Sequence, residues 1–129
     1  MSDRAGPEAS ADVPAAVAAG VRLFNRGRYL EAQELWEATW RDAPADERSF
    51  LEALVQLAGG LHLRTQRGGT RGAEHLLGRA LATLEEVGAS RHGVDVGRLL
   101  AEFGAYHDGM RASRRPHRLL DAFTVPKIR

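Results

Sequence analysis

Apolar residues recur along the chain at helical spacing, and their densest run is residues 48–63. Two adjacent apolar stripes follow this run: Phe50, Leu54, Leu57 and Leu61, and beside them Leu51, Val55, Ala58 and His62. Two neighbouring stripes bury a wide arc of a helix rather than one narrow face. We therefore expect residues 46–67 to form the central helix of a bundle.

The same spacing of three and four predicts further helices over residues 13–25, 29–41, 70–87 and 95–110. Residues 88–94 are expected to form a loop. No stretch shows sustained period-two alternation, so the predicted fold class is all-α, a compact bundle of about five helices. Five apolar residues near the end predict a short helix followed by an extended C-terminal strap: Leu119, Leu120, Phe123, Val125 and Ile128.

Length and composition indicate one globular domain without thiol chemistry. The chain has 129 residues, 43% of them hydrophobic, and no cysteine, which excludes disulfides and thiolate metal sites. Residues 1–12 are small and polar and are expected to form a disordered N-terminal segment, so that residues 13–129 form the single helical-bundle domain. No apolar run reaches the roughly 20 residues of a membrane span, and we expect a cytoplasmic protein without membrane contact.

Basic residues gather at the C-terminal end. Six of the 18 Lys and Arg residues lie within residues 111–129, where Asp121 is the single acidic residue. Such a segment can attract anions, but it also suits the acidic remainder of its own domain. The tail contains one aromatic residue, Phe123, and thus lacks the stacking platform of single-strand binders. Nucleic acid is therefore not a favoured partner.

Polar residues follow one side of the second and central helices. We call this set, with the two tryptophans beside it, the polar seam; it comprises Gln33, Glu34, Trp36, Glu37, Trp40, Arg48, Glu52 and Gln56. Residues four apart share a helix face, which aligns Gln33 with Glu37 and Arg48 with Glu52. The tryptophans are expected to be core residues that wall the seam. The polar seam is accordingly the predicted ligand-binding site.

Three interpretations of the polar seam stay open. In a structural one, Arg48 pairs with Glu34 or Glu37 and Gln33 bonds to Gln56, which would fix the register of two helices. In a second, the seam receives a small molecule, a peptide or another copy of the chain. In a third, its carboxylates bind a divalent cation and catalyse hydrolysis.

The histidines offer no support for a metal site. His75 is expected on an outer helix face, and His92, His107 and His117 show no metal-ligand spacing. We predict neither a metal site nor a cofactor.

Two stretches of the chain resemble known families. Residues 27–38, GRYLEAQELWEA, resemble the second half of a tetratricopeptide repeat, which implies stacked helical hairpins and, by analogy, a peptide-binding groove. A longer string resembles domain-of-unknown-function family 309 over about residues 24–84. It comprises Phe24, Gly27, Tyr29, Glu31, Ala32, Glu34, Trp36, Glu37, Trp40, Arg48, Phe50, Leu51, Gln56, Leu57, Ala58, Gly72, Ala73 and Leu77.

The family resemblance implies a compact helical bundle and no established activity. Its members are sometimes described as predicted metal-dependent hydrolases. The family pattern has a histidine where this chain has Gln33, and glutamine is a poorer transition-metal ligand than imidazole. The sequence thus predicts an uncharacterised binding or scaffold module that uses the polar seam, with a metal-dependent hydrolase as the alternative.

Overall fold

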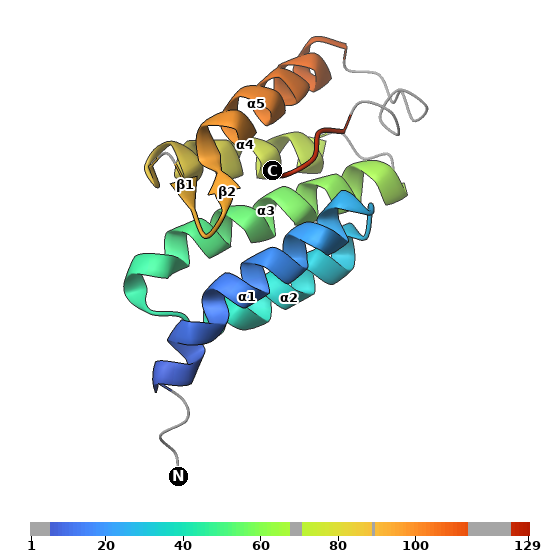
Figure 1. Cartoon of the computed structure of the whole chain (residues 1–129). Helices are drawn as coiled ribbons and strands as arrows, with labels where there is room; N and C mark the ends of the chain where they lie inside the picture. The colour runs from blue at the N-terminus through green and yellow to red at the C-terminus, as the bar shows by residue number, and fades with distance from the viewer. Residues whose placement is uncertain (1–5, 68–70, 89, 114–124) are drawn as a thin grey trace.

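The chain folds into stacked α-helices. The computed structural model describes residues 6–67, 71–88, 90–113 and 125–129. Within these ranges lie five helices and a two-stranded hairpin: α1 (Gly6–Asn25), α2 (Tyr29–Arg41), α3 (Ala45–Arg67), α4 (Arg71–Glu85), β1 (Ser90–Arg91), β2 (Val94–Asp95) and α5 (Val96–Ser113). Each helix packs mainly against the next one along the chain (Figure 1). The prediction of an all-α bundle of about five helices is confirmed.

The central position of α3 follows from its two apolar stripes. Phe50, Leu54 and Leu57 are 0–1% exposed, and α3 packs against both α2 and α4. A Cβ at Gly60 would lie 3.3 Å from the Ala73 carbonyl oxygen of α4. The absent side chain therefore allows the backbones of α3 and α4 to approach closely, which explains a glycine inside the central helix.

The boundaries of α1 agree with the sequence at one end only. Gly27 adopts φ 81°, and its N–H bonds to the Phe24 carbonyl at 2.9 Å, which ends the helix in a left-handed cap as expected. The helix begins at Gly6 instead of Val13 and contains Pro14. We expected residues 1–12 to be disordered. Of these, residues 1–5 lie outside the described residues.

A small hairpin precedes α5, where the sequence predicted only a loop. Ser90 pairs with Asp95 and Arg91 with Val94 in antiparallel register. The two turn residues, His92 and Gly93, have φ values of 49° and 83°, as a two-residue turn that matches the strand twist requires. Strands of two residues are too short to produce a visible alternation, so the pattern could not reveal them.

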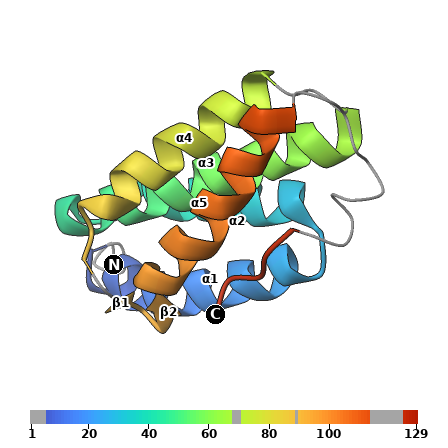
Figure 2. The ribbon, with the colours of Figure 1, turned by 90° about the horizontal axis from the view of Figure 1, so that it is seen from above.

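Residues 125–129 form an extended strap against the bundle. In Figures 1 and 2 this segment, drawn in red, runs between α1 and the start of α5. Ile128 is 2% exposed, and Phe24 of α1 meets Phe103 of α5 with ring centroids 5.8 Å apart. The extended strap is thus confirmed for these residues. The predicted short helix with Leu119, Leu120 and Phe123 lies outside the described residues.

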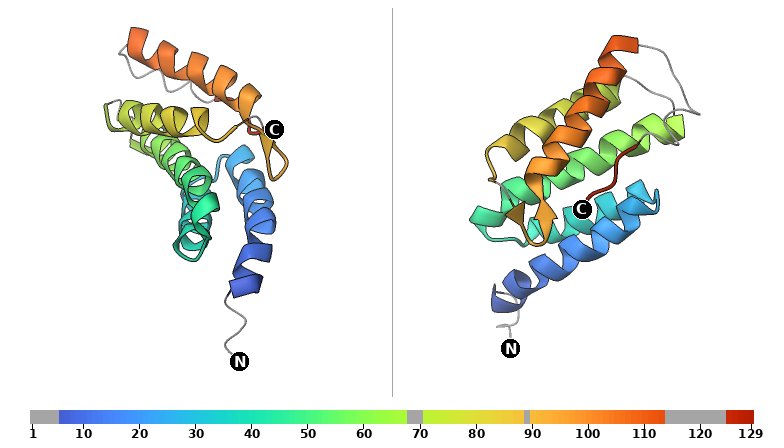
Figure 3. Two further views of the ribbon diagram at one scale, coloured as in Figure 1. Left: turned by 90° about the vertical axis from the view of Figure 1, so that its left-hand side faces the viewer. Right: turned by 45° about the horizontal axis from the view of Figure 1, so that its top comes forward.

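The helices meet at an angle rather than in a flat layer. Figure 3 shows α5 crossing α4 on one side of the stack and α1 lying on the other. Of the helices in the described ranges, none has the length and apolar character that a membrane crossing requires.

Candidate functional site

Trp36 of the polar seam points into the bundle and is 0% exposed. Its Nε1 donates a hydrogen bond to the Ala16 carbonyl of α1 at 3.2 Å. A Cβ at Gly20 would lie 2.2 Å from the indole, so α1 has no side chain where the ring packs. Trp36 therefore joins α1 to α2 inside the bundle.

Trp40 and Arg48 come together at the end of α2. The Arg48 guanidinium carbon lies 4.1 Å from the Trp40 ring centroid, and its Nη1 donates to the Trp40 carbonyl at 3.1 Å. A cation at the C-terminus of a helix satisfies carbonyls that lack intrahelical partners. The expected pairing of Arg48 with a seam carboxylate is wrong, because the guanidinium caps α2 instead, and Glu37 pairs with Arg41 at 3.9 Å.

The remaining seam residues do not form one polar network. Gln33 lies against Gly59, whose added Cβ would come within 3.0 Å of the Gln33 amide nitrogen. The Gln56 side-chain oxygen is buried without a hydrogen-bond partner, so it does not accept the bond expected from Gln33. Glu34 and Glu52 are exposed. The residues of the polar seam thus differ in their surroundings: some pack between helices, Arg48 caps α2, and Glu34 and Glu52 face solvent.

The hydrolase alternative requires a set of metal ligands. Across residues 6–67, 71–88, 90–113 and 125–129, no three His, Asp or Glu side chains gather where a metal ion could be held. Of the three seam carboxylates, Glu37 faces Arg41, and the other two are exposed on different helices.

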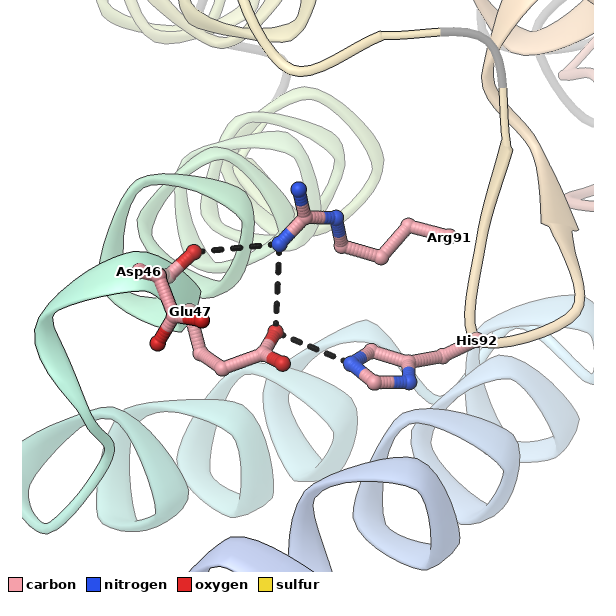
Figure 4. A network of polar contacts seen from close by, with 4 residues as sticks. All are labelled: Asp46, Glu47, Arg91 and His92. Atoms are coloured by element: carbon pink, nitrogen blue, oxygen red, sulfur yellow. Dashed lines mark hydrogen bonds and ion pairs between the residues drawn. The ribbon is translucent and has the colours of Figure 1, made fainter.

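A polar cluster that the sequence did not indicate joins the hairpin to α3. Figure 4 shows Glu47 between Arg91 and His92. His92 Nε2 lies 2.9 Å from Glu47 Oε1, and Arg91 Nη1 lies 3.4 Å from the same oxygen. Arg91 also donates to the Asp46 carbonyl at 3.0 Å. These contacts hold the hairpin on the first turn of α3.

An open depression of about 640 Å³ lies between α4 and α5, and we call it the α4–α5 groove. It is lined by three arginines, two histidines, one carboxylate and two small residues: Arg71, Arg79, Arg111, His75, His107, Glu74, Gly78 and Ala82. Two helices supply this set, six residues from α4 and two from α5. The groove is therefore a concave surface with an excess of positive charge.

Contacts between α4 and α5 hold the two sides of the groove together. His107 Nε2 donates to the Glu74 carbonyl at 3.0 Å, and a Cβ at Gly78 would lie 3.4 Å from the same nitrogen. Arg111 Nε lies 3.7 Å from the Glu74 carboxylate. The single carboxylate of the groove is thus engaged by Arg111, while exposed Arg71 and Arg79 have no ion-pair partner within the described part of the chain.

The sequence carries a signal for this groove in the spacing of its basic residues, which the apolar pattern does not reveal. Arg71, His75 and Arg79 recur at steps of four, and His107 and Arg111 are again four apart. Such spacing aligns basic side chains on one helix face. Their convergence depends on α5 crossing α4 at Gly78, which no local pattern specifies.

Residues 17–76 match the family described as "Domain of unknown function (DUF309)". No curated protein matches the chain. The match begins inside α1 and ends inside α4. It confirms the family resemblance, and it leaves Arg79, His107 and Arg111 beyond its end.

Proposed function

We propose that this chain is a binding module that takes a phosphate-bearing small molecule in the α4–α5 groove. One observation carries the proposal: three arginines and two histidines line an open depression of about 640 Å³, in which the described residues include a single carboxylate. Cavities of roughly 300–1,000 Å³ hold ligands of small-molecule size. We place the ligand here and not in the polar seam, because Trp36 and Arg48 of the seam already serve helix packing and capping.

The chemistry of the lining favours phosphate. A guanidinium presents a planar fork of donors that matches phosphate oxygens, and it stays charged at all physiological pH values. Arg71 and Arg79 are eight residues apart on α4 and so lie on the same helix face. Both are exposed and lack carboxylate partners among the described residues, which supports their use for an external anion.

The composition of the groove favours a small ligand over a single-stranded nucleic acid. Its lining contains no Phe, Tyr or Trp among the residues that the structure describes, whereas proteins that bind single strands stack bases on such rings. Among the described lining residues, Glu74 is the single carboxylate, and its side chain faces Arg111.

Isothermal titration calorimetry with inorganic pyrophosphate at low salt tests the proposal. An exposed ion pair contributes up to about 1 kcal/mol, so Arg79→Ala should weaken binding by up to about five-fold. The double variant Arg71→Ala/Arg79→Ala should weaken it further, by up to about 25-fold. Arg22→Ala is the matched control, since Arg22 is exposed on α1, outside the groove, and its loss changes the net charge equally.

Three outcomes would overturn this proposal. One is the absence of pyrophosphate binding. Another is an Arg22→Ala variant that loses as much affinity as Arg79→Ala, which would indicate nonspecific attraction to net charge. The third is a single-stranded oligonucleotide that binds more tightly than pyrophosphate and loses affinity with the same groove variants, which would assign the groove to nucleic acid.

A further inference from the structure

We propose that residues 125–129 occupy a second binding site, one that accepts an extended peptide with a large aliphatic residue after a lysine. The chain's own Lys127-Ile128 fills it in the structure. The site is formed by the end of α1 and by β2, away from the α4–α5 groove, and it does not depend on the function proposed there.

Asn25 holds the strap by its main chain. The Asn25 side-chain oxygen accepts a hydrogen bond from the Ile128 N–H at 2.8 Å, and its amide nitrogen donates to the Ile128 carbonyl at 2.9 Å. A single amide side chain thus satisfies both polar groups of one extended residue. Any residue type except proline offers the same two groups, so Asn25 recognises an extended backbone without reading its sequence.

Two side chains of the strap give the site its selectivity. The Ile128 side chain is 2% exposed, which requires an apolar residue at this position. Lys127 Nζ donates to the Asn25 carbonyl at 2.9 Å. That carbonyl ends α1, where the helix dipole favours a cation. The combination selects a lysine followed by a large aliphatic residue.

The strap is held by hydrogen bonds and by the buried Ile128 side chain. Its third main-chain anchor is the Arg129 carbonyl, which accepts from the Asp95 N–H of β2 at 2.8 Å. Beside it is a cavity of about 220 Å³ lined by Phe24, Asn25, Arg26, Gly27, Tyr29, Val125, Pro126 and Lys127. The strap therefore leaves space in its own site, and a peptide in solution can make every contact that the strap makes.

Competition between the strap and a free peptide determines what an experiment should see. A segment attached to its own site acts at an effective concentration in the millimolar range. A peptide in trans should bind the wild-type chain weakly and bind more tightly once the strap is weakened. Ile128→Ser weakens the strap and alters no residue of α1 or β2, which form the site.

The test uses a fluorescent peptide of the sequence TVPKIR, the full chain and fluorescence anisotropy, with the fold of each variant checked by far-UV circular dichroism. We expect Ile128→Ser to bind this peptide at least about ten-fold more tightly than wild type. Adding Asn25→Ala to Ile128→Ser should reverse the gain. A TVPKSR peptide is the matched control and should not bind, and pyrophosphate should not compete.

Equal peptide affinities for wild type and a folded Ile128→Ser variant would overturn the proposal, as would equal binding of TVPKIR and TVPKSR. If Ile128→Ser does not fold, Lys127→Ala replaces it. Lys127 is exposed, and loss of its bond to Asn25 should still raise affinity for the peptide several-fold. No gain with Lys127→Ala would then exclude an exchangeable strap.

Discussion

Gly20→Ala should destabilise the protein when Trp36 is present and stabilise it when Trp36 is absent. A Cβ at position 20 would lie 2.2 Å from two atoms of the indole ring, well inside the roughly 3.5–4.0 Å of a favourable carbon contact. The ring cannot move aside easily, because it is 0% exposed and bonded to the Ala16 carbonyl at 3.2 Å. Removal of the ring opens the space that the new methyl group needs.

The expected magnitudes follow from two opposing terms. Overpacking a core costs about 1–3 kcal/mol, and alanine in place of glycine inside a helix contributes about 1 kcal/mol of stability. The 2.2 Å approach favours the upper half of the overpacking range, so Gly20→Ala alone should lower the free energy of unfolding by about 1–2 kcal/mol. Trp36→Ala alone should lower it by about 3–5 kcal/mol. In the Trp36→Ala background, Gly20→Ala should raise it by about 1 kcal/mol.

Urea unfolding followed by far-UV circular dichroism measures these differences in a double-mutant cycle. Trp36→Leu provides a second background if Trp36→Ala is too unstable for a folded baseline. Gly104→Ala is the matched control, because Gly104 lies inside α5 and an added Cβ meets no atom within 4 Å. It should stabilise the protein in every background. A Gly20→Ala effect of the same sign with and without the indole would refute the steric explanation.

Two further predictions concern the end of α2 and the pH dependence of stability. Arg48→Ala should lower the free energy of unfolding by about 1–2 kcal/mol, through the lost stacking on Trp40 and the lost carbonyl bond. Arg98→Ala, which removes only an exposed pair with Glu102, should cost at most about 0.5 kcal/mol; equal losses in urea melts would contradict the capping role. Burial raises the pKa of the Tyr29 phenol above its ordinary value of 10.0, so its contribution to stability is present below pH 10.0 and declines as pH rises through the raised pKa. Tyr29→Phe should flatten that decline in urea melts taken across alkaline pH, and identical profiles for the two proteins would rule out Tyr29 as its source.

The features that could be predicted from sequence are those fixed by nearby residues. Helical periodicity located α2 and α3 because their apolar stripes repeat within each segment. The end of α1 was predictable for a similar reason, since Gly27 adopts the left-handed conformation that terminates a helix. The family resemblance was also local, because it rests on a string of side chains most of which lie inside the matched residues 17–76.

What could not be predicted depends on which helix faces meet. Trp36 and Trp40 are one turn apart on α2, yet one packs on Gly20 of α1 and the other lies under Arg48 of α3. A helical wheel shows that the two side chains share a face of α2, but it does not show which helix each of them contacts. The α4–α5 groove was missed for the same reason, because His107 comes near α4 only through the crossing at Gly78.

The strap changes how the stack of helices can come apart. Helices that touch only their neighbours along the chain can fray from either end, one unit at a time. Here the hydrogen bonds between Asn25 and Ile128 join residues 103 positions apart, and Phe24 meets Phe103 beside them. The first helix and the last are therefore in contact through the strap and these two rings. Loss of α5 must break these contacts, so we expect the two ends of the protein to unfold together.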